Sequence, residues 1–225
     1  MTHDDPAVAA TDLLSAATAE RAALAELLAS LDPDQWELPT PCSRWTVRDV
    51  AAHVISYDDL TVPRAVATLV RHRGSAGRAN ARVLARWDGV GPPEILAAYR
   101  TRLRPTGLTA VAGGRIGFLD GLIHHQDVRR AVQVPRSVPP EHLVAALHAV
   151  RGAPVLPARG LLRGLRLVAD DVAWHHGDGP EVRGPGEALL LTAAGRDVAL
   201  DELGGPGLPL LADRVAHHRH LDVAG

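Results

Sequence analysis

The stretch TPCSRWTVRDVAAHV, residues 40–54, contains the start of a helix and the first candidate site residue. Thr46 is followed three residues later by Asp49, a variant of the capping box in which two side chains satisfy exposed backbone amides at a helix N-terminus. Three prolines between residues 32 and 45 interrupt the preceding helical pattern. The sequence therefore predicts a new helix that begins at Thr46 and is kinked or interrupted at Pro63.

Helical periodicity extends to both sides of this stretch. Apolar residues recur every three or four positions, and glycines or prolines separate one periodic segment from the next. Four helices with modest connections are typical of an antiparallel four-helix bundle, which we assign to residues 1–152. Its predicted helices cover 6–31, 46–71, 92–104 and 116–132, with a shorter helix after 140 and a Gly-, Arg- and Ala-rich connector before 92.

The pattern changes in the last third of the chain, residues 153–225. Short alternating segments predict strands at 165–169, 172–175 and 181–183. Helices are expected at 187–197 and from 208 to about 218. The predicted fold class is therefore α+β, with a small C-terminal α+β domain after the bundle.

The composition excludes several kinds of chemistry. All 24 basic residues among the 225 are arginine. Without lysine the chain has no Schiff-base nucleophile, no pyridoxal-phosphate anchor and no Walker A lysine. Cys42 is the single cysteine, which excludes an intramolecular disulfide, a CxxC redox pair and an all-cysteine zinc site.

Charge and hydropathy indicate the compartment and exclude two kinds of partner. The net charge is -2, so the overall field does not favour nucleic acid. The N-terminal residues carry acids where a secretory signal carries basic residues, and no apolar run approaches the roughly 18 residues of a membrane span. We therefore expect a cytoplasmic protein that binds neither nucleic acid nor membrane.

The run DGLIHHQDVRR, residues 120–130, is the strongest candidate for a metal site. On a helix, Asp120 and His124 lie four residues apart and project from one face. His125 lies about 100° away around the same helix and does not join them. Asp127, three residues after His124, is placed to orient the second nitrogen of that imidazole or to contact a ligand.

A third ligand must come from another helix, and His53 is the best placed. Bundle cores bring facing helices together, and two imidazoles with one carboxylate bind a divalent ion while leaving a position open. Spacing alone also fits hydrogen-bonded core histidines. For Cys42, a buried structural role is favoured over a reactive thiolate. Arg129 and Arg130 fit either a substrate carboxylate or the dipole at a helix C-terminus.

These residues carry a family resemblance. TPCSRWTVRDVAAHV at 40–54 and LIHHQDVRRAV at 122–132 resemble the two signatures of the mycothiol-dependent maleylpyruvate isomerase and DinB-like superfamily. GPEVRGPGEALLLTAAGRDVALDELGG resembles the smaller domain of its actinobacterial members, so the likeness covers nearly the whole chain. It implies a DinB-like four-helix bundle that holds a divalent metal, usually zinc, through His53, Asp120 and His124. The known family pattern has Glu where this chain has Asp120.

The resemblance also implies an enzyme that uses mycothiol, a low-molecular-weight thiol, as cosubstrate. A metal-bound thiolate would add to a small electrophilic substrate, and either isomerisation or S-transfer would follow. Asp127 is then expected in a catalytic or thiol-binding role and Arg130 in thiol binding. Two alternatives stay open, namely a metal-free scaffold that binds a small molecule and a thiol-independent isomerase or cyclase of secondary metabolism.

Overall fold

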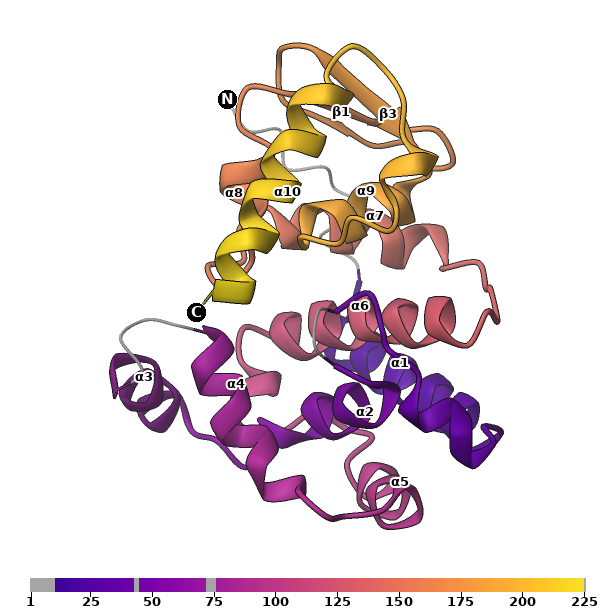
Figure 1. Cartoon of the computed structure of the whole chain (residues 1–225), viewed down its shortest axis with the longest axis vertical. Coiled ribbons are helices and arrows are strands. Elements are labelled where there is room, and N and C mark those ends of the chain that lie inside the picture. Colours follow the sequence, from indigo (N-terminus) through magenta and orange to yellow (C-terminus); the bar gives the residue numbers. More distant parts are fainter. Residues whose placement is uncertain (1–10, 43–44, 72–75, 225) are drawn as a thin grey trace. The chain divides into compact units, whose positions relative to one another are not determined.

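The computed structural model describes residues 11–42, 45–71 and 76–224, which form two compact units. One unit spans residues 12–136 and the other residues 137–224. The architecture is α+β, as the sequence predicts, because many helices accompany one small three-stranded sheet. Figure 1 labels the α-helices and the strands β1 and β3.

Four helices of the first unit form a bundle around a shared core. Helices α1 and α2 each pack against both α5 and α6. Leu24, Leu28, Ile55 and Tyr99 are among the fully buried side chains of this core. Burying one leucine or isoleucine stabilises the fold by about 1.5–3 kcal/mol relative to exposing it. The four bundle helices are α1 (Leu13–Ala29), α2 (Val47–Ser56), α5 (Pro92–Arg100) and α6 (Arg115–Ala131).

The close approach of α6 to α1 depends on a glycine. Gly114 precedes α6 with a φ of +86°, and a Cβ at this position would lie 2.7 Å from the Cα of Leu14. Only glycine combines this left-handed backbone with so short a contact. Residues of α6 consequently pack along α1, and most of the helix is buried.

Two elements of this unit differ from the sequence prediction. The predicted helix from Thr46 ends at Ser56, and a separate helix begins before Pro63, which occupies the first turn where a missing N–H is tolerated. The stretch interpreted as a connector contains a further helix that packs on α2. These elements are α3 (Val62–Arg71) and α4 (Ala76–Leu84); residues 6–10 of the predicted first helix lie outside the described residues.

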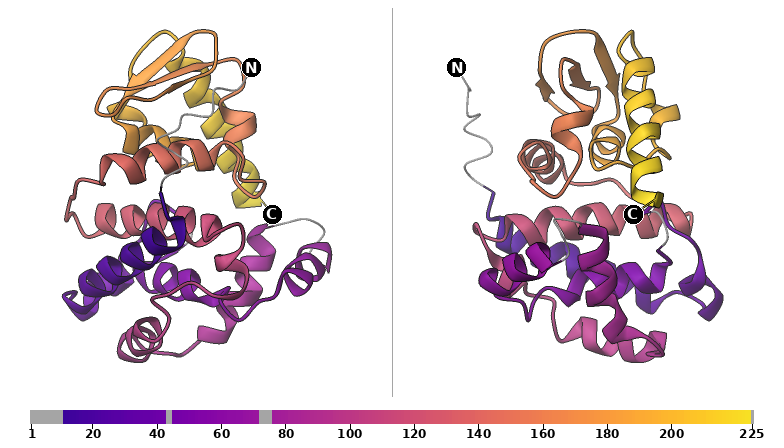
Figure 2. Two further views of the ribbon diagram at one scale, coloured as in Figure 1. Left: turned by 180° about the vertical axis from the view of Figure 1, so that it is seen from behind. Right: turned by 60° about the vertical axis from the view of Figure 1, so that its left-hand side comes forward.

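The second unit holds the sheet, shown from two sides in Figure 2. Its strand order is β2-β1-β3, with β1 antiparallel to β2 and parallel to β3. Helix α9 packs on β1 and β3, and α7 packs on α9. The sequence analysis places α7 in the bundle; its contacts with α9 place it in the second unit. The elements are α7 (Pro140–Val150), α8 (Ala158–Leu161), β1 (Arg166–Ala169), β2 (His175–His176), β3 (Glu181–Gly184), α9 (Gly186–Ala193) and α10 (Leu208–Ala224).

Short 3₁₀ helices complete both units. In the first unit, one 3₁₀ helix follows α1, one follows α4 and one lies between α5 and α6. In the second unit, one follows α9. The segment after α4 contributes to a pocket described below. The 3₁₀ helices are Pro33–Glu37, Ala85–Trp87, Gly107–Ala110 and Leu200–Glu202.

Candidate metal centre

The structure brings together the three side chains that the sequence analysis proposes as metal ligands. His53 lies on α2, while Asp120 and His124 lie one turn apart on α6, which packs against α2. Nε2 of His53 is 3.2 Å from Oδ1 of Asp120, and Nε2 of His124 is 3.6 Å from the same oxygen. One ligand atom from each of the three residues lies within 4.8 Å of the other two.

The local sequence explains why these side chains face one another. The capping box predicted at Thr46 and Asp49 is present, and it fixes the first turn of α2. His53 follows two turns later on the buried part of this helix. Because residues four apart share a helix face, α6 presents Asp120 and His124 together.

The centre is largely removed from solvent but is not sealed. His53 and His124 are each 6% exposed, and the side chain of Asp120 is 26% exposed. Asp120 is therefore the most exposed of the three proposed ligands. A partly dehydrated centre strengthens electrostatic interactions among its groups.

Asp127 holds the imidazole of His124 from the other side. Its Oδ2 lies 3.0 Å from Nδ1 of His124, and its side chain is fully buried. A carboxylate at this distance accepts a hydrogen bond from Nδ1–H of His124, which leaves Nε2 as the nitrogen available to a metal ion. Such carboxylate–histidine pairs are typical of metal sites, where they fix the tautomer and the ring orientation.

Aromatic rings border the centre. The ring centroid of Trp45 lies 4.4 Å from that of His53 and 5.6 Å from that of His124. Tyr57 approaches His53 edge-on at 5.5 Å. Sequence patterns did not connect Trp45 or Tyr57 with the site, although these residues lie eight and four positions from His53 in the chain. These rings limit the access of water to one side of the imidazoles.

Electrostatics keep the carboxylate of the centre ionised. Burial raises the pKa of Asp120, but the charges of His53 and His124 outweigh it and lower that pKa to about 2. Burial, together with the nearby charge of Asp120, raises the pKa of Tyr57 to about 12. At neutral pH the centre therefore has one ionised carboxylate and an un-ionised phenol.

This donor set fits a divalent ion of borderline softness. Imidazole nitrogen and carboxylate oxygen are common zinc ligands, and a tetrahedral ion at about 2.0–2.1 Å from each holds them about 3.3 Å apart. The separations of 3.2 and 3.6 Å from Asp120 to the two histidines are close to that value. The residues present therefore suit zinc with three protein ligands.

A second set of potential ligands shares one histidine with the first. Ligand atoms of Cys42, His124 and Asp127 also lie within 4.8 Å of one another. The sequence analysis gives Cys42 a structural role and does not anticipate this proximity. Asp127 already contacts Nδ1 of His124. The ligand set with His53 and Asp120 uses the other nitrogen of this ring, Nε2.

The other basic and imidazole groups of α6 occupy different positions. Nδ1 of His125 lies 3.1 Å from Glu20 on α1, and Arg129 donates to Nε2 of His125 at 2.9 Å. Burial lowers the pKa of His125 to about 4, so this buried ring is neutral at pH 7. As helical spacing predicts, His125 does not join His124. Arg130 is half-buried at the last turn of α6.

Comparison with known proteins identifies the family of this chain. The family model described as the mycothiol maleylpyruvate isomerase N-terminal domain matches residues 17–178, more than half of the chain. The chain belongs to this family. The resemblance in the sequence signatures is thereby confirmed, and the match includes every proposed ligand of the centre.

Two solved structures share the fold of this family member. A mycothiol-dependent maleylpyruvate isomerase is 19% identical with a TM-score of 0.55, and a mutant of such an isomerase is 17% identical with a TM-score of 0.54. Each alignment covers 92% of this chain and 96% of the other. No curated protein matches the sequence. Within the described residues, no helix combines the length and the apolar character that crossing a membrane requires.

Proposed function

We propose that this family member is a thiol-dependent isomerase or S-transferase activated by a divalent metal, most simply zinc, at His53, Asp120 and His124. The observation that carries the proposal is the convergence of two Nε2 atoms and one carboxylate oxygen between α2 and α6. The family model and both similar structures are named for mycothiol chemistry, which supports mycothiol as the thiol cosubstrate.

The residues around the centre have separable roles in this proposal. A divalent cation held there supplies Lewis acidity that lowers the pKa of a bound thiol. Asp127 keeps the proton of His124 on Nδ1 and so keeps Nε2 available as a ligand. Trp45 and Tyr57 exclude water from one side of the imidazoles. No protein nucleophile is required, in agreement with a chain that lacks lysine.

The cosubstrate thiolate would act as the nucleophile. Its addition to one carbon of an electron-poor double bond forms a carbon–sulfur bond and moves the π electron pair onto the conjugated electron-withdrawing group, which leaves a carbon–carbon single bond that can rotate. If the carbon–sulfur bond then breaks, the thiol is returned and the product is a cis–trans isomer. If the carbon–sulfur bond stays, the anionic adduct takes up the proton that the thiol released, and the product is a thioether. We assign Arg130, on the last turn of α6, to binding the polar part of the thiol.

One sample tests the proposal with two measurements. Elemental analysis of protein purified without added metal is expected to give one divalent ion per chain. Thermal unfolding with mycothiol at about 100 times its dissociation constant is then expected to show a stabilisation of about 2.7 kcal/mol. Chelated protein that retains full thiol-dependent turnover contradicts the role of the metal.

A second candidate function is a metal-free scaffold that binds a small molecule. It is favoured by one contact, because Nε2 of His53 and Oδ1 of Asp120 are already within hydrogen-bonding distance at 3.2 Å. Such a pair satisfies Nε2 of His53 and one carboxylate oxygen of Asp120 without an ion. A protein that purifies without metal and does not respond to thiol supports this second function over the first.

A further inference from the structure

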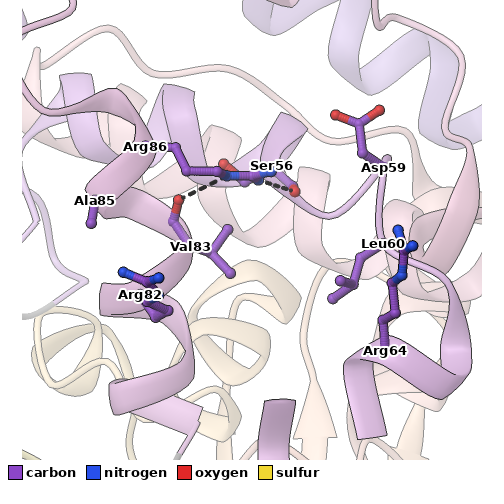
Figure 3. Close-up of a pocket in the computed structure, with 8 residues that line it drawn as sticks. All are labelled: Ser56, Asp59, Leu60, Arg64, Arg82, Val83, Ala85 and Arg86. Carbon is purple, nitrogen blue, oxygen red and sulfur yellow. Dashed lines mark hydrogen bonds between the residues drawn. The ribbon is translucent and has the colours of Figure 1, made fainter. Parts of the chain in front are cut away.

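A pocket of about 430 Å³ opens at the C-terminal end of α2, and none of the three proposed metal ligands is among the residues that line it. Side chains from the end of α2, from α3, from α4 and from the following 3₁₀ helix line it, as Figure 3 shows. Three of these side chains are arginines, namely Arg64, Arg82 and Arg86. The proposed function assigns no role to any of them.

The sequence concentrates positive charge in the segment that builds this pocket. Residues 60–87 contain six of the 24 arginines and no aspartate or glutamate. The whole chain has 26 acidic residues and a net charge of -2. Positive charge of this density without interspersed acids attracts anions to the surface that carries it.

One of the three guanidinium groups is held in place by backbone carbonyls. Arg86 donates from one terminal nitrogen to the carbonyl oxygen of Ser56 at 2.7 Å and from Nε to that of Val83 at 3.3 Å. Trp87 donates to the hydroxyl of Ser56 at 2.8 Å, which fixes the same turn. Arg86 is therefore oriented before any ligand arrives, which lowers the entropic cost of binding.

The other two arginines lie on opposite sides of the pocket, Arg82 from α4 and Arg64 from α3 (Figure 3). Arg82 is exposed, and within the part of the chain that the structure describes it has no hydrogen bond or ion pair. Asp59 supplies the single carboxylate of the lining, and it lies 3.7 Å from Arg102. The lining therefore holds an excess of positive charge.

Apolar surface separates the arginines. Leu60, Val83 and Ala85 also line the pocket. A guanidinium group recognises carboxylate and phosphate oxygens through paired hydrogen bonds. Apolar walls between such groups favour an organic anion over an inorganic ion. Contact between the walls and the hydrocarbon part of the organic anion removes apolar surface from water.

We propose that this pocket binds a small organic molecule with oxyanion groups, which Arg82 and Arg64 engage from opposite sides while Arg86 supplies a fixed third charge. Binding requires neither a metal nor a thiol, so the proposal is independent of the proposed catalytic function. The anionic groups are carboxylates or phosphate esters, and the test below separates these two sources.

Isothermal titration of the full-length protein at low ionic strength tests this proposal. The probes are glutarate, its uncharged dimethyl ester, glycerol 3-phosphate and inorganic phosphate, each titrated into the protein as purified and into protein stripped of metal by a chelator that is then dialysed away. We expect glutarate or glycerol 3-phosphate to bind, and the tighter of the two identifies the oxyanion. The ester should not bind, inorganic phosphate should bind at least tenfold more weakly, and removal of metal should change nothing.

Matched variants locate the binding. Arg82→Gln and Arg64→Gln should each weaken binding of the tighter organic anion about tenfold or more, whereas Arg100→Gln, an exposed arginine on α5, should leave it unchanged. Circular dichroism confirms that the variants fold. The proposal is overturned if neither organic anion binds, if inorganic phosphate binds equally well, if removal of metal abolishes binding, or if Arg82→Gln and Arg100→Gln behave alike.

Discussion

The imidazole of His124 lies between two carboxylates of its own helix, with Nδ1 3.0 Å from Oδ2 of Asp127 and Nε2 3.6 Å from Oδ1 of Asp120. Asp120 precedes His124 by four residues and Asp127 follows it by three, so the helical repeat alone brings the three side chains together. His53 then needs only the packing of α2 on α6 to complete the centre.

Asp127 supports the centre through His124, so replacing its carboxylate should weaken metal binding without removing a ligand. Asp127→Asn is expected to lower zinc affinity about 10- to 100-fold, the usual effect of losing such a partner. Competition with a chromophoric chelator measures the affinity. Asp59→Asn, which changes an exposed carboxylate, serves as control and should bind zinc like the wild type.

Neighbouring histidines on α6 should differ in their contribution to metal binding. His124→Asn removes a proposed ligand and should abolish stoichiometric zinc binding. His125→Asn alters a buried ring that contacts Glu20, so it should reduce stability while zinc is retained. Zinc titration and urea unfolding of both variants make the comparison. Equal loss of zinc in the two variants contradicts the assignment.

Much of the bundle and of the centre follows from local sequence. The predicted helix 116–132 differs from α6 by one residue at each end, because glycines precede it and its periodicity is regular. The spacing of Asp120 and His124 then follows from the helical repeat. Trp45 beside His53 and Cys42 beside Asp127 depend on how separate segments pack, which local periodicity does not encode.

The helix α4 illustrates the same limit. Glycines and arginines in its sequence are typical of a connector, whereas α4 packs on α2. The hydroxyl of Tyr57, the C-cap residue of α2, donates a hydrogen bond to Asn80 of α4. The three arginines of the pocket beside α4 lie up to 22 residues apart in the chain. Proximity of this kind appears only once the helices are placed.

Removing one partner of a buried ion pair should strongly destabilise the first unit. Arg21 is fully buried and donates to both carboxylate oxygens of Asp58, at 2.7 and 3.0 Å. Thr109 donates a further hydrogen bond to Asp58. Asp58→Ala leaves the guanidinium buried without its carboxylate and should lower the free energy of unfolding by about 3–5 kcal/mol.

Urea denaturation measures this loss, and Arg21→Met combined with Asp58→Leu provides the comparison. Removing both charges eliminates the uncompensated one, so the double variant should be more stable than Asp58→Ala alone. If the double variant loses as much free energy of unfolding as Arg21→Met and Asp58→Leu lose separately when added together, the two side chains do not stabilise the protein as a pair.

Asp120 should make metal-free protein sensitive to acid. Its pKa is lowered to about 2 in the folded state, below the value of about 3.9 in an unfolded chain. The stabilisation is therefore present above about pH 4 and is lost as the pH falls to 2. Asp120→Asn should cost about 2 kcal/mol at pH 5 and progressively less toward pH 2. Unfolding curves in chelator at several pH values give this difference, and a constant offset contradicts the prediction.

Zinc titration of the chelated full-length protein beside His53→Asn tests whether α2 and α6 share one metal centre. We expect one tightly bound ion per wild-type chain and no stoichiometric binding in the variant, although both are folded. A wild-type chain that takes up no zinc, or a variant that binds it with undiminished affinity, would contradict a centre shared between α2 and α6.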